Sequence, residues 1–168
     1  MKNLITIIAA VVLVAVTATV SAQVTGTATG SATIIAPIAI ANAGNMNFGS
    51  IAVSTAPGTV VLSTAAARTA SGGVTLPAVT GSVTTAKFTV TGLGASTYSI
   101  SLPSSYIISD GASHNMTVNN FVSDPSGTGA LTAGTQTINV GATLNVLGSQ
   151  TAGTYTNATG FNVTVNYN

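Results

Sequence analysis

The last nine residues of the chain, GFNVTVNYN (Gly160–Asn168), alternate strictly between two kinds of side chain. Phe161, Val163, Val165 and Tyr167 are apolar or aromatic, and the residues between them are Asn or Thr. Side chains point alternately to the two faces of a strand, so this pattern predicts a β-strand with one buried face. Most domains fray at their ends. So regular an ending predicts that these residues complete the hydrophobic core.

The same alternation recurs along the chain, and no helical periodicity competes with it. Strand-favouring Val, Ile, Thr and aromatic residues dominate the runs GTVVLST (58–64), AKFTVTG (86–92), STYSISLP (96–103), SHNMTVNNFV (113–122) and TQTINVGATLNVLG (135–148). Many short strands separated by turn residues predict an all-β antiparallel sandwich in preference to a barrel. No repeat or interior linker marks a second domain, so residues 23–168 are predicted to form a single domain.

Details of these runs predict local structure. Pro37 argues against a central strand in IIAPIAIAN (34–42), because proline cannot donate a hydrogen bond to a neighbouring strand. A slip in the alternation before Phe121 predicts a bulge, and Gly141 is expected to break the register of its strand. Turns are predicted at Gly72-Gly73, Asp110-Gly111, Asp124-Pro125-Ser126-Gly127 and Ala133-Gly134.

Residues 1–22 have the composition of a secretory signal peptide. Lys2 supplies a positive charge, an apolar run extends from Leu4 to Val16, and small residues precede Gln23. The apolar run is short for a membrane-spanning helix, which needs about 20 residues. Cleavage before Gln23 is therefore favoured over a membrane anchor. The mature protein is expected in the periplasm, at the outer surface or in an extracellular filament, with no membrane span.

The mature chain is almost uncharged. Arg68, Lys87, Asp110 and Asp124 remain charged after cleavage, and His114 is the single histidine. Charged residues make up 3% of the whole chain, against about 25% in typical globular proteins. This composition supplies no basic patch for nucleic acid. A surface of Thr, Ser, Asn and Gly has little charge repulsion, which favours packing against copies of itself or against a larger matrix.

The segment SDGASHN (109–115) contains the residue types of a catalytic triad, Ser109, Asp110 and His114. A triad is defined by its geometry and not by closeness in sequence, and Asp110-Gly111 is better explained as a hairpin turn. Calcium takes about six to eight oxygen ligands, whereas Asp110 and Asp124 lie in separate turns. We therefore expect no catalytic, metal or cofactor site and no enzyme activity.

Several stretches occur in an order that is similar to a known family. They are an N-terminal alternating run, NMNFGSI (45–51), AKFTVTG, STYSISLP, VGATLNV (140–146), GTYT (153–156) and the ending FNVTVNY. Over nearly the whole mature chain this set resembles the secreted bacterial family catalogued as domain of unknown function 4402. In outline it is also similar to spore coat protein U and other chaperone–usher pilin subunits. The resemblance implies an immunoglobulin-like (pilin-like) β-sandwich at the cell surface, with a periplasmic chaperone as a candidate partner.

The run QVTGTATGSATI (23–34) alternates small or apolar residues with Thr and Ser. In strand complementation, an extended segment of one subunit adds to the sheet of the next and places alternate side chains in pockets. Small side chains bury little apolar area. This run is therefore expected to be the first strand of its own domain in preference to a donor strand for a neighbour. The candidate strand-exchange residues are Val24, Gly26, Ala28, Gly30 and Ala32 here, and Phe161, Val163, Val165 and Tyr167 at the other end.

These observations predict a secreted, non-enzymatic structural or adhesive protein that associates with itself or with other surface-protein subunits in a filament or surface layer. The alternative is a secreted module that binds carbohydrate or another surface. Sugar sites often use aromatic platforms, and this chain has no Trp and four tyrosines, Tyr98, Tyr106, Tyr155 and Tyr167. Two exposed tyrosines on one concave face would favour the alternative.

Overall fold

The computed structural model describes residues 22–168, of which residues 22–34 belong to one unit and residues 35–168 to another. Residues 22–34 contain no strand, and all of their side chains are exposed. The prediction that residues 24–32 form the first strand of their own domain is therefore wrong. Gly and Ala side chains offer too little apolar area to offset the entropy lost on ordering such a segment. The predicted signal peptide lies, except for its last residue, outside the described residues.

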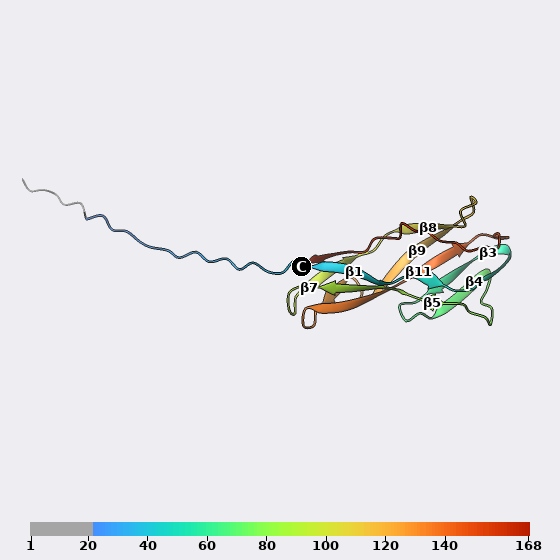
Figure 1. Cartoon of the computed structure of the whole chain (residues 1–168), viewed down its shortest axis with the longest axis horizontal. Helices are drawn as coiled ribbons and strands as arrows, with labels where there is room; N and C mark the ends of the chain where they lie inside the picture. The colour runs from blue at the N-terminus through green and yellow to red at the C-terminus, as the bar shows by residue number, and fades with distance from the viewer. Residues whose placement is uncertain (1–21) are drawn as a thin grey trace, which may run out of the picture. The chain divides into compact units, whose positions relative to one another are not determined.

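A seven-stranded antiparallel sheet forms one layer of the folded unit (Figure 1). Its strands are β1 (Ala39–Gly44), β3 (Ala52–Leu62), β4 (Arg68–Thr75), β6 (Ala86–Thr91), β8 (Ser105–Ser109), β9 (Asn115–Asp124) and β11 (Thr135–Val146). One edge of β11 pairs first with β6 and then with β3, and its other edge pairs with β9. Further from β11, β1 pairs with β6, β4 pairs with β3 and β8 pairs with β9. The strand that follows Pro37 is thus an edge strand, in agreement with the sequence.

The second layer consists of two separate pieces. A three-stranded sheet has the order β10 (Thr128–Ala130), β7 (Thr97–Ser101) and β12 (Thr164–Tyr167). A two-stranded ribbon pairs β2 (Asn47–Phe48) with β5 (Val83–Thr84). Residues 22–168 contain no helix. The predicted all-β antiparallel sandwich is confirmed.

Each piece of the second layer covers its own part of the core. Ile138 of β11 and Tyr98 of the three-stranded sheet belong to one cluster of buried residues. Leu144 of β11 and Phe48 of the ribbon belong to the other. β11 contributes to both clusters because its even-numbered residues, from Ile138 to Val146, all face inward. This strand therefore joins the two halves of the core.

The pairing of β11 with β9 shifts register between Gly141 and Thr143, as the sequence predicted for Gly141, while the inward face of β11 continues without a break through Ala142. Gly141 also lies where the neighbour of β11 changes from β6 to β3, and a Cβ there would be 2.2 Å from the carbonyl oxygen of Leu62. Glycine is needed for this close backbone approach. The register shift lies in β9, where Asn120 and Phe121 stand opposite one residue of β11. This confirms the predicted bulge.

Three of the four predicted turns connect strands, at Asp110-Gly111, at Asp124–Gly127 and at Ala133-Gly134. In the last, both residues have positive φ, 50° and 80°, as a two-residue type I′ hairpin requires. Gly72-Gly73 is not a turn, because it lies within β4 opposite a bulge in β3. A Cβ on the second of these glycines would be 2.0 Å from the carbonyl oxygen of Ala56. The glycines therefore make room for the bulge.

The C-terminal residues pack into the core as their alternation predicts, although regular strand structure is limited to β12. Val163 and Val165 are buried, and Phe161 and Tyr167 pack partly buried against the same cluster. β12 pairs with β7 along one edge. Within residues 22–168, no strand pairs with its other edge.

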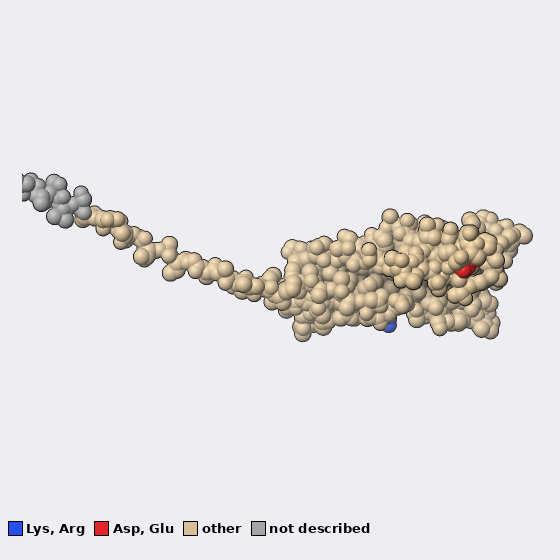
Figure 2. All heavy atoms as spheres, turned by 45° about the horizontal axis from the view of Figure 1, so that its top comes forward, with Lys and Arg blue, Asp and Glu red and all other residues tan. Residues whose placement is uncertain are grey.

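The surface carries very little charge. Figure 2 shows one face on which single blue and red patches stand among otherwise uncharged residues. On the outer face of the seven-stranded sheet, Lys87 and Asp124 lie on either side of Asn139. Among residues 22–168 no helix has the length and apolar character that a membrane crossing needs.

Candidate functional site

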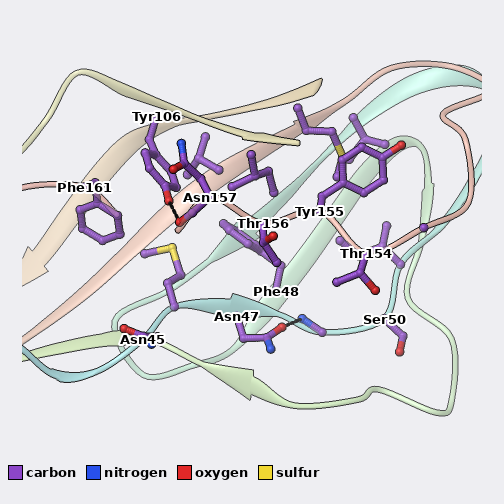
Figure 3. Close-up of a pocket in the computed structure, with 18 of the residues that line it drawn as sticks. Asn45, Asn47, Phe48, Ser50, Tyr106, Thr154, Tyr155, Thr156, Asn157 and Phe161 are labelled. Atoms are coloured by element: carbon purple, nitrogen blue, oxygen red, sulfur yellow. Dashed lines mark hydrogen bonds between the residues drawn. The ribbon is translucent and has the colours of Figure 1, made fainter. Parts of the chain in front are cut away.

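An open groove lies where the two pieces of the second layer do not meet. Residues 45–53, which include β2, form its first side, and residues 150–161, which lead to β12, form its second side. The floor includes Phe88, Val118 and Val146 from the inner face of the seven-stranded sheet. The volume of the groove is about 1120 Å³. Figure 3 shows Asn45, Asn47 and Ser50 along the first side and Tyr155, Thr156 and Asn157 along the second.

A tight turn builds the first side. The side-chain oxygen of Asn47 accepts a hydrogen bond from the N–H of Gly49 at 2.8 Å. Gly49 has a φ of 71°, a conformation that favours glycine. The guanidinium of Arg68 donates from Nη1 to the carbonyl oxygens of Phe48 and Ser50, at 2.6 and 2.9 Å. One glycine and one cationic side chain thus fix the shape of this side.

The second side is tied to the edge of β8. Ser109 and Thr156 exchange two backbone hydrogen bonds, at 2.9 and 2.8 Å. The amide of Asn157 donates to the carbonyl oxygen of Ile107 at 2.8 Å. The hydroxyl of Tyr106 donates to the carbonyl oxygen of Asn157 at 2.7 Å. These bonds hold an irregular segment in a strand-like position next to the seven-stranded sheet.

Apolar side chains that line the groove remain partly exposed. The ring of Phe161 lies 6.2 Å from that of Phe88, 5.6 Å from that of Tyr106 and 4.9 Å from that of Phe121, measured between centroids. Met46 lines the groove too and packs against both core clusters. Concave apolar surface of this kind is typical of a binding site. Covering it would bury further apolar area.

The groove is electrostatically neutral. None of the described residues that line it is Asp, Glu, Lys, Arg or His. Burial raises the pKa of Tyr106 above its ordinary value of 10.0, so its phenol is uncharged at neutral pH. A groove without charge suits an occupant without charge, because a charged group would lose its hydration here and gain no partner.

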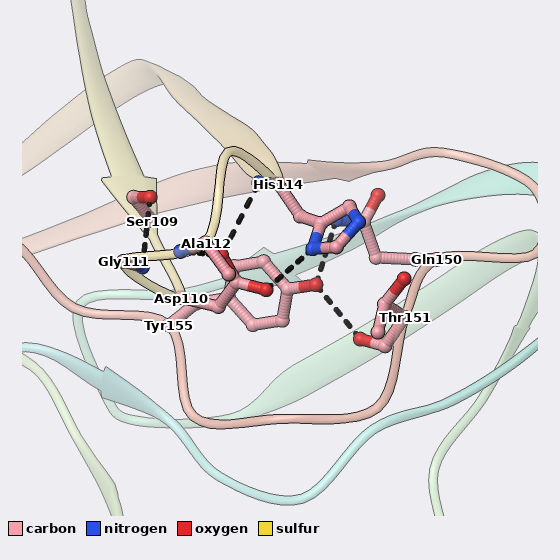
Figure 4. Close-up of polar contacts among 8 residues, drawn as sticks. All are labelled: Ser109, Asp110, Gly111, Ala112, His114, Gln150, Thr151 and Tyr155. Carbon is pink, nitrogen blue, oxygen red and sulfur yellow. Dashed lines mark hydrogen bonds and ion pairs between the residues drawn. The ribbon is translucent and has the colours of Figure 1, made fainter.

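A hydrogen-bonded pair of side chains, His114 and Asp110, lies in the turn between β8 and β9, next to the second side of the groove (Figure 4). His114 Nδ1 is 2.6 Å from Asp110 Oδ2, and Asp110 Oδ1 accepts hydrogen bonds from the N–H groups of Ala112 and His114. The contact with His114 and the bond from Ala112 lower the pKa of the Asp110 carboxyl. The hydroxyl of Ser109 accepts a hydrogen bond from the N–H of Gly111 at 3.1 Å. The cluster lies in the hairpin turn between β8 and β9, which the sequence predicted at Asp110-Gly111.

The predicted strand-exchange residues occupy three different places. Phe161 lines the groove. The other C-terminal candidates fill the protein's own core and do not line the groove; they are Val163, Val165 and Tyr167. The N-terminal candidates lie on the exposed segment of residues 22–34; they are Val24, Gly26, Ala28, Gly30 and Ala32.

Sequence reasoning missed most of the groove. Two of the motifs that support the family resemblance, NMNFGSI (45–51) and GTYT (153–156), lie on its opposite sides. Neither motif alternates over a useful length, because one contains a tight turn and the other is irregular. Their Phe48 and Tyr155 were the available signals, since aromatic residues in turn-rich segments call for a burial partner.

Comparison with known proteins agrees with that resemblance. Residues 38–167, well over half of the chain, match the family described as Domain of unknown function (DUF4402). The chain belongs to this family. The DUF4402 match begins next to β1 and ends with β12, so it includes both sides of the groove and leaves residues 22–37 outside. No curated protein and no solved structure matches the chain.

Proposed function

We propose that this DUF4402 protein is a secreted, non-enzymatic structural or adhesive protein of the bacterial surface. Copies associate through strand-mediated contacts, with one another or with other surface-protein subunits, in a filament or a surface layer. A periplasmic chaperone is a further partner before assembly, because an open apolar groove needs cover until the subunit reaches its place.

The observation that most supports this proposal is the state of residues 22–34. The segment alternates as a strand does, yet Val24 is 93% exposed and Ile34 is 98% exposed. An extended segment of this kind gains backbone hydrogen bonds and side-chain burial when it adds to the edge of another sheet. The uncharged surface supports the same proposal, because it opposes close packing of copies very little.

Association can be tested on the processed protein after expression of the full chain in a bacterium. Light scattering across a wide range of concentrations should show oligomers that grow with concentration, and electron microscopy should show filaments or a layer on the cells. A variant without residues 24–34 is the matched control and should stay monomeric. A protein that is monomeric at every concentration, on cells without such structures, would contradict the proposal.

A carbohydrate-binding module is the second candidate, because Tyr106 and Tyr155 line the same groove. Both side chains are only half-exposed. Both hydroxyls are also engaged by the chain, since that of Tyr106 donates to the carbonyl oxygen of Asn157 and that of Tyr155 to the carbonyl oxygen of Thr151. The structural proposal is therefore preferred. Specific binding on a glycan array by the monomeric protein would reverse that preference.

A further inference from the structure

We propose that the groove of one copy receives residues 24–34 of a second copy as an added strand. This inference rests on the proposed function, and it names the acceptor surface and the donor segment for it. Three properties of the molecule support it: open backbone groups along the groove, the alternation and size of the donor side chains, and the absence of charge on both partners.

The second side of the groove presents unpaired backbone groups. Successive residues of an extended chain direct their N–H and C=O groups to opposite sides. Thr156 uses its own backbone groups to pair with Ser109 of β8, so those of its neighbour Tyr155 point the other way, toward the groove. Among residues 22–168 the N–H and C=O of Tyr155 have no hydrogen-bond partner. A strand laid in the groove would supply partners for them.

The donor segment has the period that such a position requires. Its even-numbered residues are Val, Gly, Ala, Gly, Ala and Ile, and its odd-numbered residues from Thr25 to Thr33 are Thr or Ser. In a strand, one set would face the apolar floor and the other would face solvent. The outward set would continue the uncharged Thr- and Asn-rich surface of the sandwich, so no polar side chain would be forced into the groove.

The small side chains fit the shape of the floor. Met46, Tyr106 and Phe161 line the groove, and each packs partly buried against the core beneath it. A donor with large residues at every inward position would collide with them, whereas Gly and Ala leave room. Val24 and Ile34 then act as apolar anchors at the two ends of the segment. The size of the donor residues, which made 24–32 a poor strand of its own sheet, suits a groove that is already partly filled.

The donor segment and the groove are both uncharged. Residues 23–35 contain no Asp, Glu, Lys, Arg or His, and neither do the described residues that line the groove. An uncharged strand loses no ionic hydration on entering an uncharged groove. A charge placed on the inward face of the donor should therefore block docking, and the same charge on the outward face should be tolerated.

Disulfide trapping can test the contact, because the chain has no cysteine of its own. Donor and acceptor chains are made with different molecular masses, so that a mixed dimer can be recognised. The donor chain carries Gly26→Cys, Ala28→Cys, Gly30→Cys or Ala32→Cys, which allows for different registers. The acceptor chain carries Ser50→Cys or Ala158→Cys at the two sides of the groove, or Thr137→Cys on the outer face of β11 as the control. After mixing and mild oxidation, a mixed dimer should form with a groove position and not with the control. A disulfide demands Cα atoms about 4.4–6.8 Å apart.

Two aspartate substitutions in the donor segment give an independent measurement. Ala28→Asp adds a carboxylate to the inward face of the donor, and Thr27→Asp adds the same charge one residue away on the outward face. Ala28→Asp should weaken association by about tenfold or more, while Thr27→Asp should leave it nearly unchanged. Both positions are exposed, so neither change affects the folded unit.

Several results would overturn this inference. In one outcome, oligomers persist but the mixed dimer forms equally well with Thr137→Cys, or forms with neither side of the groove. The contact would then lie elsewhere on the surface, and the proposed function would stand. Equal effects of the two aspartates would exclude an alternating donor. A monomeric disulfide in a chain carrying both Ala28→Cys and Ala158→Cys, with no linked dimers, would show that the segment fills its own groove. Absence of any association in the unmodified protein would overturn the proposed function itself.

Discussion

The hydroxyl of Tyr167 donates a hydrogen bond to the carbonyl oxygen of Ala36 at 3.0 Å, although the two residues are separated by almost the whole folded chain. The same hydroxyl accepts a hydrogen bond from the N–H of Leu93 at 2.7 Å. One phenol therefore ties together the C-terminal strand, the loop after β6 and the point at which the chain enters the fold. These two hydrogen bonds attach the C-terminal strand to the rest of the folded unit.

Tyr167→Phe removes both hydrogen bonds while it keeps the ring in the core. The N–H of Leu93 and the carbonyl oxygen of Ala36 then lose their partner. We expect a loss of about 1–3 kcal/mol in the free energy of unfolding, measured by chemical denaturation. Asn166→Ala, on the exposed face of the same strand, is the control and should change stability by less than about 0.5 kcal/mol. Equal effects of the two variants would show that the hydroxyl of Tyr167 contributes nothing to the free energy of unfolding.

Gly141→Ala should be among the most damaging single substitutions in the chain. Its Cβ would stand 2.2 Å from a backbone oxygen of Leu62, and backbone cannot move aside as a flexible side chain can. We expect a loss of about 3 kcal/mol in the free energy of unfolding, or failure to fold. Gly153→Ala is the matched control, because its nearest atom would be 3.8 Å away, an ordinary contact. A stable Gly141→Ala protein would contradict the way in which β3 follows β6 along β11.

Arg68→Ala should loosen the first side of the groove. The guanidinium donates to two carbonyl oxygens of the turn at residues 48–50, and the second of these bonds is exposed to solvent. A hydrogen bond to a charged group contributes about 1.5–3 kcal/mol, and exposure weakens it. The free energy of unfolding should therefore fall by about 1.5–3 kcal/mol in total, and amide hydrogen exchange should rise in residues 45–53. Lys87→Ala removes a cation from the exposed outer face and should change neither the stability of the protein nor the amide exchange of residues 45–53. Unchanged exchange in the turn would show that Arg68 does not hold it.

Asp110 should make stability depend on pH at the acid end. Its hydrogen bonds with His114 and Ala112 lower its pKa in the folded state. Its contribution is therefore fully present above the pKa of the unfolded chain, about 3.9, and is lost as pH falls through the lower folded value. Asp110→Asn should flatten the acid limb of a plot of melting temperature against pH. An unaltered limb in Asp110→Asn would contradict the role of this carboxylate.

Alternation in the sequence predicted the parts of the fold in which one face of a strand is buried. The inward residues of 86–91, of β11 and of 161–167 all face the core as expected. The bulge at Phe121 was also visible, because it shifts the alternation by one residue. In such segments the local period and the long-range packing give the same answer.

The groove and the N-terminal segment could not be predicted in the same way. Alternation in residues 24–32 indicates that a strand would have one apolar face, but it does not indicate whose sheet would cover that face. Gly72-Gly73 has the composition of a turn, and only the bulge that packs against it explains why it lies within β4. The sides of the groove depend on contacts such as Arg68 with Phe48, between residues that are distant in sequence.

The position of β11 determines the order in which the protein can acquire its structure. Both core clusters need this strand, and its partners β3 and β6 precede it by many residues. Neither half of the core can close until residue 146 is available, so the domain cannot fold stepwise from its N-terminal end. Contacts between such distant residues slow folding. The chain should therefore fold in one cooperative step once β11 is complete.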